Sequence, residues 1–253
     1  MPPDDAAPPF FDYDRDGDLD LYVLTNELEE FNRNTIRPRL VRGEAPSTDR
    51  LYRNDGNGTF TNVSSAAGIM IEGYGLGVAV TDFNRDGWPD IYVANDFLTN
   101  DLLWINNGDG TFPNRAGEYL KHQTHNAMGT DIADYNNDGL VDVVVLDMLP
   151  PGNMREKTMI QAGNYDRFHM SLQLGYQPQY MRNTLQLNNG PAQSAAPTFS
   201  EIGQLAGVSD TDWSWAPLLA DFDNDGHKDL FISNGYRRDV TNLDYIVYLQ
   251  EGG

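Results

Sequence analysis

A short acidic segment occurs four times in this chain, and its repetition constrains the fold more than any other feature. The copies read DYDRDGDLDLYV from Asp12, DFNRDGWPDIYV from Asp82, DYNNDGLVDVVV from Asp134 and DFDNDGHKDLFI from Asp221. Each has Asp at positions 1, 5 and 9, Asp or Asn at position 3 and Gly at position 6, and strand-forming residues follow. Chance does not keep one register four times, so we expect a chain built from structural repeats.

Two further elements recur between the acidic segments. An Asn-Gly or Asp-Gly turn between apolar segments, the strongest short-range hairpin signal, appears in LYRNDGNGTFTNV (51–63), LWINNGDGTFPNR (103–115) and LQLNNG (185–190) with TFSEI (198–202). An apolar segment leads into the acidic loop in GVAVTDF (77–83), GTDIADY (129–135) and APLLADF (216–222). One repeat is therefore strand, acidic loop, strand, strand, turn, strand. Such units bury their faces only against neighbours, which predicts an all-β fold, a β-propeller with four-stranded antiparallel blades.

The spacing of the copies predicts one partial propeller domain, 1–253, with three to four blades. The units fall at about 11–70, 74–120, 127–207 and 213–253, and insertions fall at about 26–50 and 148–183. The second insertion contains GNMREKTMIQAGNYDRF, which can form a short helix. Both insertions leave the second strand of a unit, so we expect them on one face, where loops commonly carry binding residues.

The alternating oxygen donors of the acidic loops suit a hard cation. Ca²⁺ takes six to eight oxygen ligands, and a glycine at position 6 allows the sharp turn that aims the position 7 carbonyl inward. An EF-hand would need Glu at position 12, but Val23, Val93, Val145 and Ile232 stand there. The residues thus predict calcium loops between strands, and solvated acidic turns without metal are the alternative.

The D-x-(D/N)-x-D-G-x-x-D loop between two strands of a repeated unit resembles the FG-GAP repeat, also called the VCBS repeat, of integrin α-subunit propellers. The NNGDGTF hairpin and VVVLDMLPPGN resemble a bacterial branch that shares the repeat with the cartilage acidic protein group. The resemblance implies a calcium-stabilised propeller, usually seven-bladed, with extracellular adhesion or glycan-related roles. It also implies up to four Ca²⁺ ions, one per loop.

Carried onto this sequence, the resemblance gives each site the side chains at positions 1, 3, 5 and 9 and the carbonyl of position 7. The sets are Asp12, Asp14, Asp16, Asp18 and Asp20; Asp82, Asn84, Asp86, Trp88 and Asp90; Asp134, Asn136, Asp138, Leu140 and Asp142; and Asp221, Asp223, Asp225, His227 and Asp229. The second and third sets contain a neutral Asn, so we expect them to bind calcium more weakly than the first and fourth.

Composition limits the partners. The formal net charge of -21 argues against nucleic acid and anionic membrane surfaces. No apolar run approaches the ~20 residues of a membrane span. The absence of Cys excludes disulfides and thiolate sites, and MPPDDAAPPF is not a secretory signal. With the resemblance, we expect an extracellular or cell-surface location, a signal upstream, and a protein or carbohydrate ligand at the loop face.

The chain begins almost at the first acidic loop, with AAPPF in place of an entering strand, and stops soon after the fourth. We therefore expect a fragment, or a ring completed by other blades or chains. Open ends would leave Val143, Val145, Leu230 and Ile232 under-covered and favour self-association.

Three other groups of residues have a functional and a structural interpretation. His122 and His125 could reach zinc, but no third nitrogen ligand is near, which favours packing. Trp213 and Trp215 are either core residues or a sugar-stacking platform, and Asp210 and Asp212 form either surface charge or an acid/base pair. The function classes that stay open are a non-catalytic binding module and the propeller portion of a polysaccharide-processing enzyme.

Overall fold

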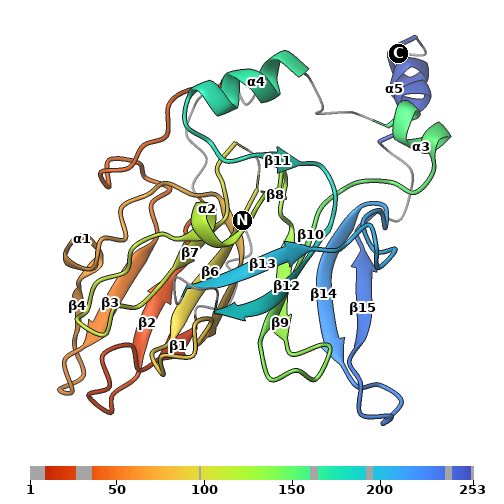
Figure 1. Cartoon of the computed structure of the whole chain (residues 1–253). Helices are drawn as coiled ribbons and strands as arrows, with labels where there is room; N and C mark the ends of the chain where they lie inside the picture. The colour runs from red at the N-terminus through yellow and green to blue at the C-terminus, as the bar shows by residue number, and fades with distance from the viewer. Residues whose placement is uncertain are drawn as a thin grey trace.

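The computed structural model describes residues 9–26, 36–96, 98–159, 165–191, 196–236 and 241–251. Its architecture is a row of antiparallel sheets, one for each repeat of the sequence (Figure 1). The predicted fold class, an all-β propeller of repeated antiparallel blades, is therefore confirmed over these ranges.

The first and third sheets have the four strands that the sequence predicts. Unit 1 consists of β1 (Phe10–Phe11), β2 (Asp20–Val23), β3 (Arg50–Asn54) and β4 (Phe60–Asn62), followed by α1 (Ser64–Ala67). Unit 3 consists of β9 (Gly129–Ala133), β10 (Asp142–Leu146), β12 (Thr184–Pro191) and β13 (Pro197–Glu201). Strand β1 was not expected. A two-residue strand begins at the last residue of AAPPF, where Phe10 and Phe11 pair with Leu21 and Asp20.

The second and fourth sheets are shorter. Unit 2 has β5 (Gly75–Thr81), β6 (Asp90–Asn95) and β7 (Leu102–Trp104), then α2 (Ala116–Tyr119); an isolated bridge between Trp104 and Asn114 stands where the fourth strand would be. Unit 4 has β14 (Ser214–Ala220) and β15 (Asp229–Asn234) in the described residues, and α5 (Leu243–Glu251) follows.

The core lies between sheets, because central strands are buried on both faces. In β10, Val143 and Val145 pack against unit 2, whereas Val144 and Leu146 belong to a cluster with residues of unit 4. In β6, Ile91 and Val93 face unit 1 in the same way. Because successive side chains of a strand point to opposite faces of the sheet, one central strand contributes residues to the interfaces with both neighbouring units.

The expectation of under-covered apolar residues is wrong for Val143 and Val145, which are buried against unit 2. Leu230 and Ile232 pack on unit 3 and are partly buried. The exposed apolar face of unit 4 carries the alternate residues instead: Phe231 is 57% exposed and Leu218 is 48% exposed.

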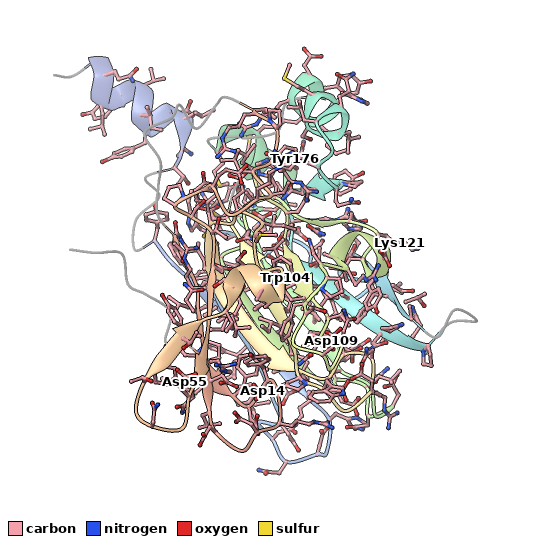
Figure 2. All side chains as sticks on the ribbon, turned by 90° about the vertical axis from the view of Figure 1, so that its left-hand side faces the viewer. Asp14, Asp55, Trp104, Asp109, Lys121 and Tyr176 are labelled. Atoms are coloured by element: carbon pink, nitrogen blue, oxygen red, sulfur yellow. The ribbon has the colours of Figure 1, made fainter. Side chains whose placement is uncertain are left out.

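The described parts of both insertions lie at one end of the sheets, as the sequence predicts, and the acidic loops lie at the other (Figure 1). Residues 27–35 and 160–164 of the insertions lie outside the described ranges. The second insertion contains the predicted helical segment as two helices, α3 (Asn153–Thr158) and α4 (Tyr165–Gln173), and β11 (Gln179–Tyr180), which pairs in parallel with β8 (Gln123–Thr124). The hydroxyl of Tyr176 donates to the carbonyl of Arg37 at 2.8 Å, which joins the two insertions directly. Figure 2 shows the same polarity, with Asp14, Asp55 and Asp109 at one end and Tyr176 toward the other.

First strands of neighbouring units approach closely at glycines. A Cβ on Gly129 of β9 would collide with the carbonyl oxygen of Trp215 in β14, and a Cβ on Gly77 of β5 would lie 3.1 Å from the backbone nitrogen of Thr130. Because a backbone oxygen cannot turn aside, Gly129→Ala forces the two strands apart, whereas Gly77→Ala needs only a small shift.

We expect Gly129→Ala to lower the free energy of unfolding by about 2–3 kcal/mol and Gly77→Ala by about 1 kcal/mol or less. Denaturant unfolding of the two variants beside the wild-type chain measures both values. Equal losses in the two variants would contradict this packing of first strands.

Candidate metal centres in the acidic loops

All four acidic loops have the same backbone conformation. Position 4 is left-handed with a φ of 61° in each, although it holds Arg15, Arg85, Asn137 or Asn224. The glycine at position 6 also has a positive φ, between 85° and 96°. Two left-handed residues so close together curl the chain around its own carboxylates, which explains why position 6 is Gly in every copy.

Hydrogen bonds within the loops follow one register. The N–H of the position 6 glycine donates to the position 1 carboxylate in every loop, at 3.1, 2.7, 2.8 and 3.0 Å in chain order. The N–H of position 7 donates to the position 5 carboxylate at 2.9, 2.8, 2.8 and 2.8 Å. The carboxylates at positions 1 and 5 therefore hold the loop in shape by accepting backbone N–H groups of the same loop.

The position 9 aspartate ties the loop to the sheet. Asp20, Asp90 and Asp142 are fully buried. One oxygen of each accepts the N–H of position 2, at 3.0, 2.9 and 3.2 Å. The other oxygen accepts the N–H of an asparagine at 2.8 Å in each unit. Asn54 and Asn188 lie in the third strand of their units, and Asn106 follows the third strand, β7, by two residues. Burial raises the pKa of Asp90 to about 7 and that of Asp142 to about 6.

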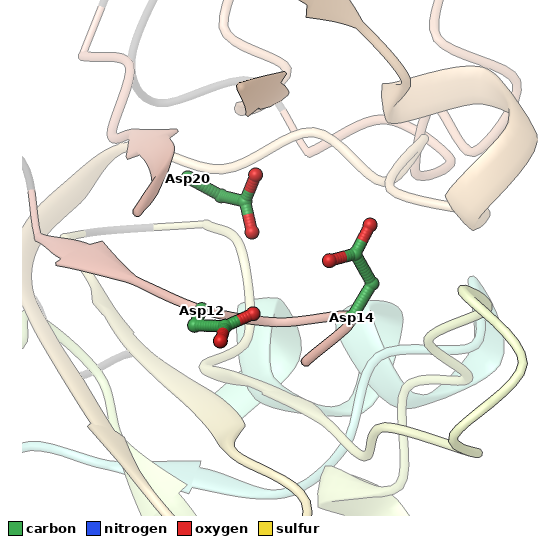
Figure 3. A group of neighbouring side chains, drawn as sticks. All are labelled: Asp12, Asp14 and Asp20. Atoms are coloured by element: carbon green, nitrogen blue, oxygen red, sulfur yellow. The ribbon is translucent and has the colours of Figure 1, made fainter. Parts of the chain in front are cut away.

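In the first and fourth loops the carboxylates at positions 1, 3 and 9 gather around one point. Carboxylate oxygens of Asp12, Asp14 and Asp20 lie within 4.8 Å of one another, and the same holds for Asp221, Asp223 and Asp229. Figure 3 shows the first three side chains converging; Asp12 directly follows β1, Asp14 lies in the loop and Asp20 begins β2. Oδ1 of Asp12 is buried and has no hydrogen-bond partner among the described residues. An unpartnered buried carboxylate oxygen inside an all-oxygen donor set fits a calcium ion.

The second and third loops differ at position 3. The side-chain N–H of Asn84 donates to Asp86 at 2.8 Å, and that of Asn136 donates to Asp138 at 2.9 Å. The amide thus relieves part of the carboxylate repulsion that a cation would otherwise neutralise. This geometry supports weaker calcium binding at these two loops, and the ligand roles of positions 5 and 7 in all four loops stay a prediction.

Neighbouring acidic loops contact each other through position 4. The guanidinium of Arg15 lies 4.2 Å from the ring centroid of Trp88 at position 7 of the next loop. Between the third and fourth loops, the side-chain N–H of Asn137 donates to the carbonyl of Gly226 at 2.9 Å. A cation that orders one loop would therefore also restrain the next.

The other candidate residues have structural partners. Nε2 of His122 lies 3.1 Å from Glu201 and 2.9 Å from Arg182, and the backbone N–H of His125 donates to Asp147. Asp212 accepts from Arg155 at 2.7 Å, which lowers the pKa of Asp212.

The two tryptophans do not share a strand. Trp213 precedes β14 and packs edge-on against Tyr236 at 4.8 Å, whereas Trp215 lies within β14 and is 42% exposed.

The sequence analysis did not identify two buried tyrosine–aspartate contacts. They lie in units 1 and 2, at the end of the second strand away from the acidic loop. The hydroxyls of Tyr22 and Tyr92 donate to Asp49 and Asp101, each at 2.7 Å. Both aspartates are buried, and burial raises the pKa of each to about 7.

In unit 3 the same two positions hold Val144 and Asn183. Where the hydroxyl is missing, an uncharged amide replaces the carboxylate. The two positions thus change together between repeats, from Tyr and Asp to Val and Asn, and this correlated change in the sequence could have identified the contact.

We expect Tyr22→Phe to lower the free energy of unfolding by about 1–3 kcal/mol at pH 8, because the buried Asp49 carboxylate loses a donor. The pKa of Asp49 is about 7 in the folded chain and about 3.9 for an unperturbed Asp. Between these two pH values the folded chain binds one proton more than the unfolded chain. The contribution of Asp49 to the free energy of unfolding therefore falls as the pH rises from about 4 to about 7. The loss in the variant is therefore largest above pH 7 and shrinks toward pH 5.

Unfolding of Tyr22→Phe at fixed calcium, from pH 5 to pH 8, tests this, with Tyr52→Phe as the matched control that removes a hydroxyl with no observed partner. Asp49→Asn added to Tyr22→Phe recreates the uncharged arrangement of unit 3 and should recover part of the loss. A loss that does not change with pH, or no recovery in the double variant, would contradict the assignment.

Comparison with known proteins agrees with this architecture. The family model described as FG-GAP-like repeat matches residues 12–93 and 82–145, more than half of the chain. Cartilage acidic protein 1 of Xenopus tropicalis is 28% identical over 187 residues, which cover 73% of this chain and 25% of that protein. The Homo sapiens protein of the same name is 27% identical over 195 residues, 76% of this chain and 24% of that protein. The chain thus spans about a quarter of the length of these relatives.

A solved structure described as the structural basis of recognition of non-reducing terminal N-acetylglucosamine by an Agrocybe aegerita lectin is 18% identical. The match covers 89% of this chain and 59% of the lectin with a TM-score of 0.35, which is too low to inform on fold or ligand. The repeat register, the shared loop geometry and the family match lead to one conclusion: this chain belongs to the FG-GAP-like repeat family.

Proposed function

We propose that this chain is a calcium-stabilised, non-catalytic binding module that works outside the cell. Its acidic loops hold up to four Ca²⁺ ions at one end, and its insertions present a ligand surface for a protein or a carbohydrate at the other. The observation that carries the proposal is the convergence of Asp12, Asp14 and Asp20, with a buried oxygen of Asp12 that has no other partner among the described residues.

Bound calcium would supply the positive charge that these carboxylates lack. The side chains at positions 1, 3, 5 and 9 and the carbonyl of position 7 are the groups that would hold it. In units 1 to 3 the position 9 carboxylate also accepts the N–H of an asparagine in the third strand or just after it, so neutralising its charge would stabilise the contact between the second and third strands. The described helices include none that is both apolar and long enough to span a bilayer.

An extracellular location is supported by the relatives. The relatives named above are called cartilage acidic protein, and this chain shares their acidity with a formal net charge of -21. The alternative is the propeller portion of a polysaccharide-processing enzyme, which turnover of a polysaccharide by the purified chain would favour.

We expect calcium to raise the melting temperature and a chelator to lower it. At about 2 mM calcium and a dissociation constant near 10⁻⁴ M, mass action gives about 1.8 kcal/mol per site, so several sites are comparable with the stability of a domain. Differential scanning calorimetry with calcium, magnesium or chelator measures the effect. An unchanged melting temperature in excess chelator, with no calcium in the purified protein, would contradict the proposal.

Exchanging the residues at position 3 tests the loops individually. We expect Asp14→Asn to weaken the first site and Asn84→Asp to strengthen the second, because one carboxylate is removed or added in an otherwise matched loop. Asn84→Asp should also melt at a lower temperature in chelator, since the added charge is then uncompensated. Calcium titration by calorimetry gives the affinities, and weaker binding in Asn84→Asp would overturn the assignment.

A further inference from the structure

Asparagine precedes glycine at four places in this chain, and such pairs are chemically reactive. The pairs are Asn57-Gly58, Asn107-Gly108, Asn189-Gly190 and Asn234-Gly235, and all four asparagines are exposed. The backbone nitrogen that follows an asparagine can attack Cγ of its side chain, and glycine allows this most readily because it has no Cβ to obstruct the approach. Sequence and exposure alone make the four pairs equivalent.

The structure distinguishes the pairs by the state of the attacking nitrogen. In three of them the glycine N–H donates to an oxygen at 2.9 Å: Gly108 to Oδ1 of Asn106, Gly190 to Oδ1 of Asn188, and Gly235 to the carbonyl of Trp213. The N–H of Gly58 has no hydrogen-bond partner among the described residues. A nitrogen that already donates must break its bond before it can lose the proton and attack, so Gly58 alone of the four is ready to react.

The side chain of Asn57 is also held differently from those of Asn107 and Asn189. Oδ1 of Asn57 accepts the N–H of Thr59 at 3.0 Å and the hydroxyl of Thr59 at 2.6 Å. Two donors on this oxygen draw electron density away from Cγ and make it a better electrophile.

In Asn107 and Asn189 the bonded atom is instead Nδ2, the nitrogen that must leave. Nδ2 of Asn107 donates to Oγ1 of Thr111 at 2.9 Å, and Nδ2 of Asn189 donates to the carbonyl of Thr198 at 3.0 Å. These bonds restrain the leaving group, and Nδ2 of Asn57 has no acceptor among the residues that the structure describes.

The hairpin turns of units 1 and 2 explain why only one pair is open. They read DGNGT (55–59) and NGDGT (107–111), and both lie at the end of the molecule where Figure 2 labels Asp55 and Asp109. The N–H of the first glycine is bonded in both turns, since Gly56 donates to Oδ1 of Asn54 at 3.1 Å just as Gly108 donates to Asn106. The second glycine has no such acceptor in the described part of either turn.

Unit 2 already holds an aspartate before its second glycine. Oδ1 of Asp109 accepts the N–H and the hydroxyl of Thr111 at 3.0 and 2.6 Å, the same two bonds that Asn57 accepts from Thr59. An aspartate therefore fits the position of Asn57 without a change in the turn.

We propose that Asn57 is a site of spontaneous deamidation, and that the fold protects the other three Asn-Gly pairs. The backbone nitrogen of Gly58 loses its proton to hydroxide and forms a bond to Cγ of Asn57. The bond from Cγ to Nδ2 breaks, and Nδ2 takes up a proton and leaves as ammonia. Water then opens the cyclic imide at either carbonyl, which gives aspartate or isoaspartate. The net reaction consumes one water and releases one ammonia, with no change in oxidation state.

The modification lies next to the first acidic loop. A Cβ on Gly56 would lie 2.8 Å from Oδ2 of Asp18, so the turn that carries Asn57 is in contact with position 7 of that loop. Deamidation thus adds a negative charge beside the loop. The reaction itself needs no metal and does not depend on the proposed function.

Incubation of the folded chain at pH 8, followed by peptide mass spectrometry that separates aspartate from isoaspartate, tests the proposal. We expect Asn57 to deamidate at least about fivefold faster than Asn107, Asn189 or Asn234, the factor that corresponds to one ordinary hydrogen bond that must break first. In denaturant, where all four pairs lack these bonds, the four rates should become similar.

Two variants test the role of the turn. Asp109→Asn places an amide before the open glycine of unit 2 and should create a second fast site. Asp55→Asn is the matched control, because it places an amide before Gly56, whose N–H is bonded, and this amide should react as slowly as Asn107. The melting temperature of each variant shows that it is folded.

Equal rates at Asn57 and Asn107 in the folded chain, or a slow amide in Asp109→Asn, would overturn the proposal. A preference for Asn57 that persists unchanged in denaturant would overturn it as well, because the difference would then come from the neighbouring sequence and not from the fold.

Discussion

The buried aspartate at position 9 of the first three acidic loops is the group on which these repeats depend. In the first three units its two oxygens accept one N–H from the loop and one from an asparagine in the third strand or, in unit 2, just after it. A single side chain thus connects the loop, the second strand and the third strand or its end. Such a buried carboxylate is costly without compensation, and its surroundings show the cost in the raised pKa of Asp90. A cation beside it would remove that cost, which links calcium to folding through one residue per unit.

Once each unit is closed in this way, the strand period determines the rest of the packing. Central strands such as β10 place alternate residues in the interfaces to the preceding and following units, so no unit has a core of its own. Inserted residues are therefore accommodated where the chain leaves one strand and before it begins the next. The described parts of the two insertions lie at the end opposite the acidic loops, and there they form α4 and β11.

The sequence was sufficient for the repeat, the fold class, the shared conformation of the loops and the face on which the insertions lie. These features follow from residues at fixed spacing, such as Asp12 to Gly17, or from the strand that an insertion leaves. The Tyr22–Asp49 contact was not predicted, because it joins segments whose separation differs from unit to unit. The burial of Val143 was misjudged, because which side of a strand meets a neighbour depends on the arrangement of the sheets.

Amide hydrogen exchange at Phe83 and Asn106, the two N–H groups that bond Asp90, tests the central claim most directly. With calcium present, we predict that both amides exchange as slowly as the most protected amides of β6, and that chelation accelerates them together. Asp90→Asn should accelerate at least one of them even in calcium, because an amide cannot accept at both of its terminal atoms. Exchange at these two amides that is the same in calcium, in chelator and in Asp90→Asn would contradict the account.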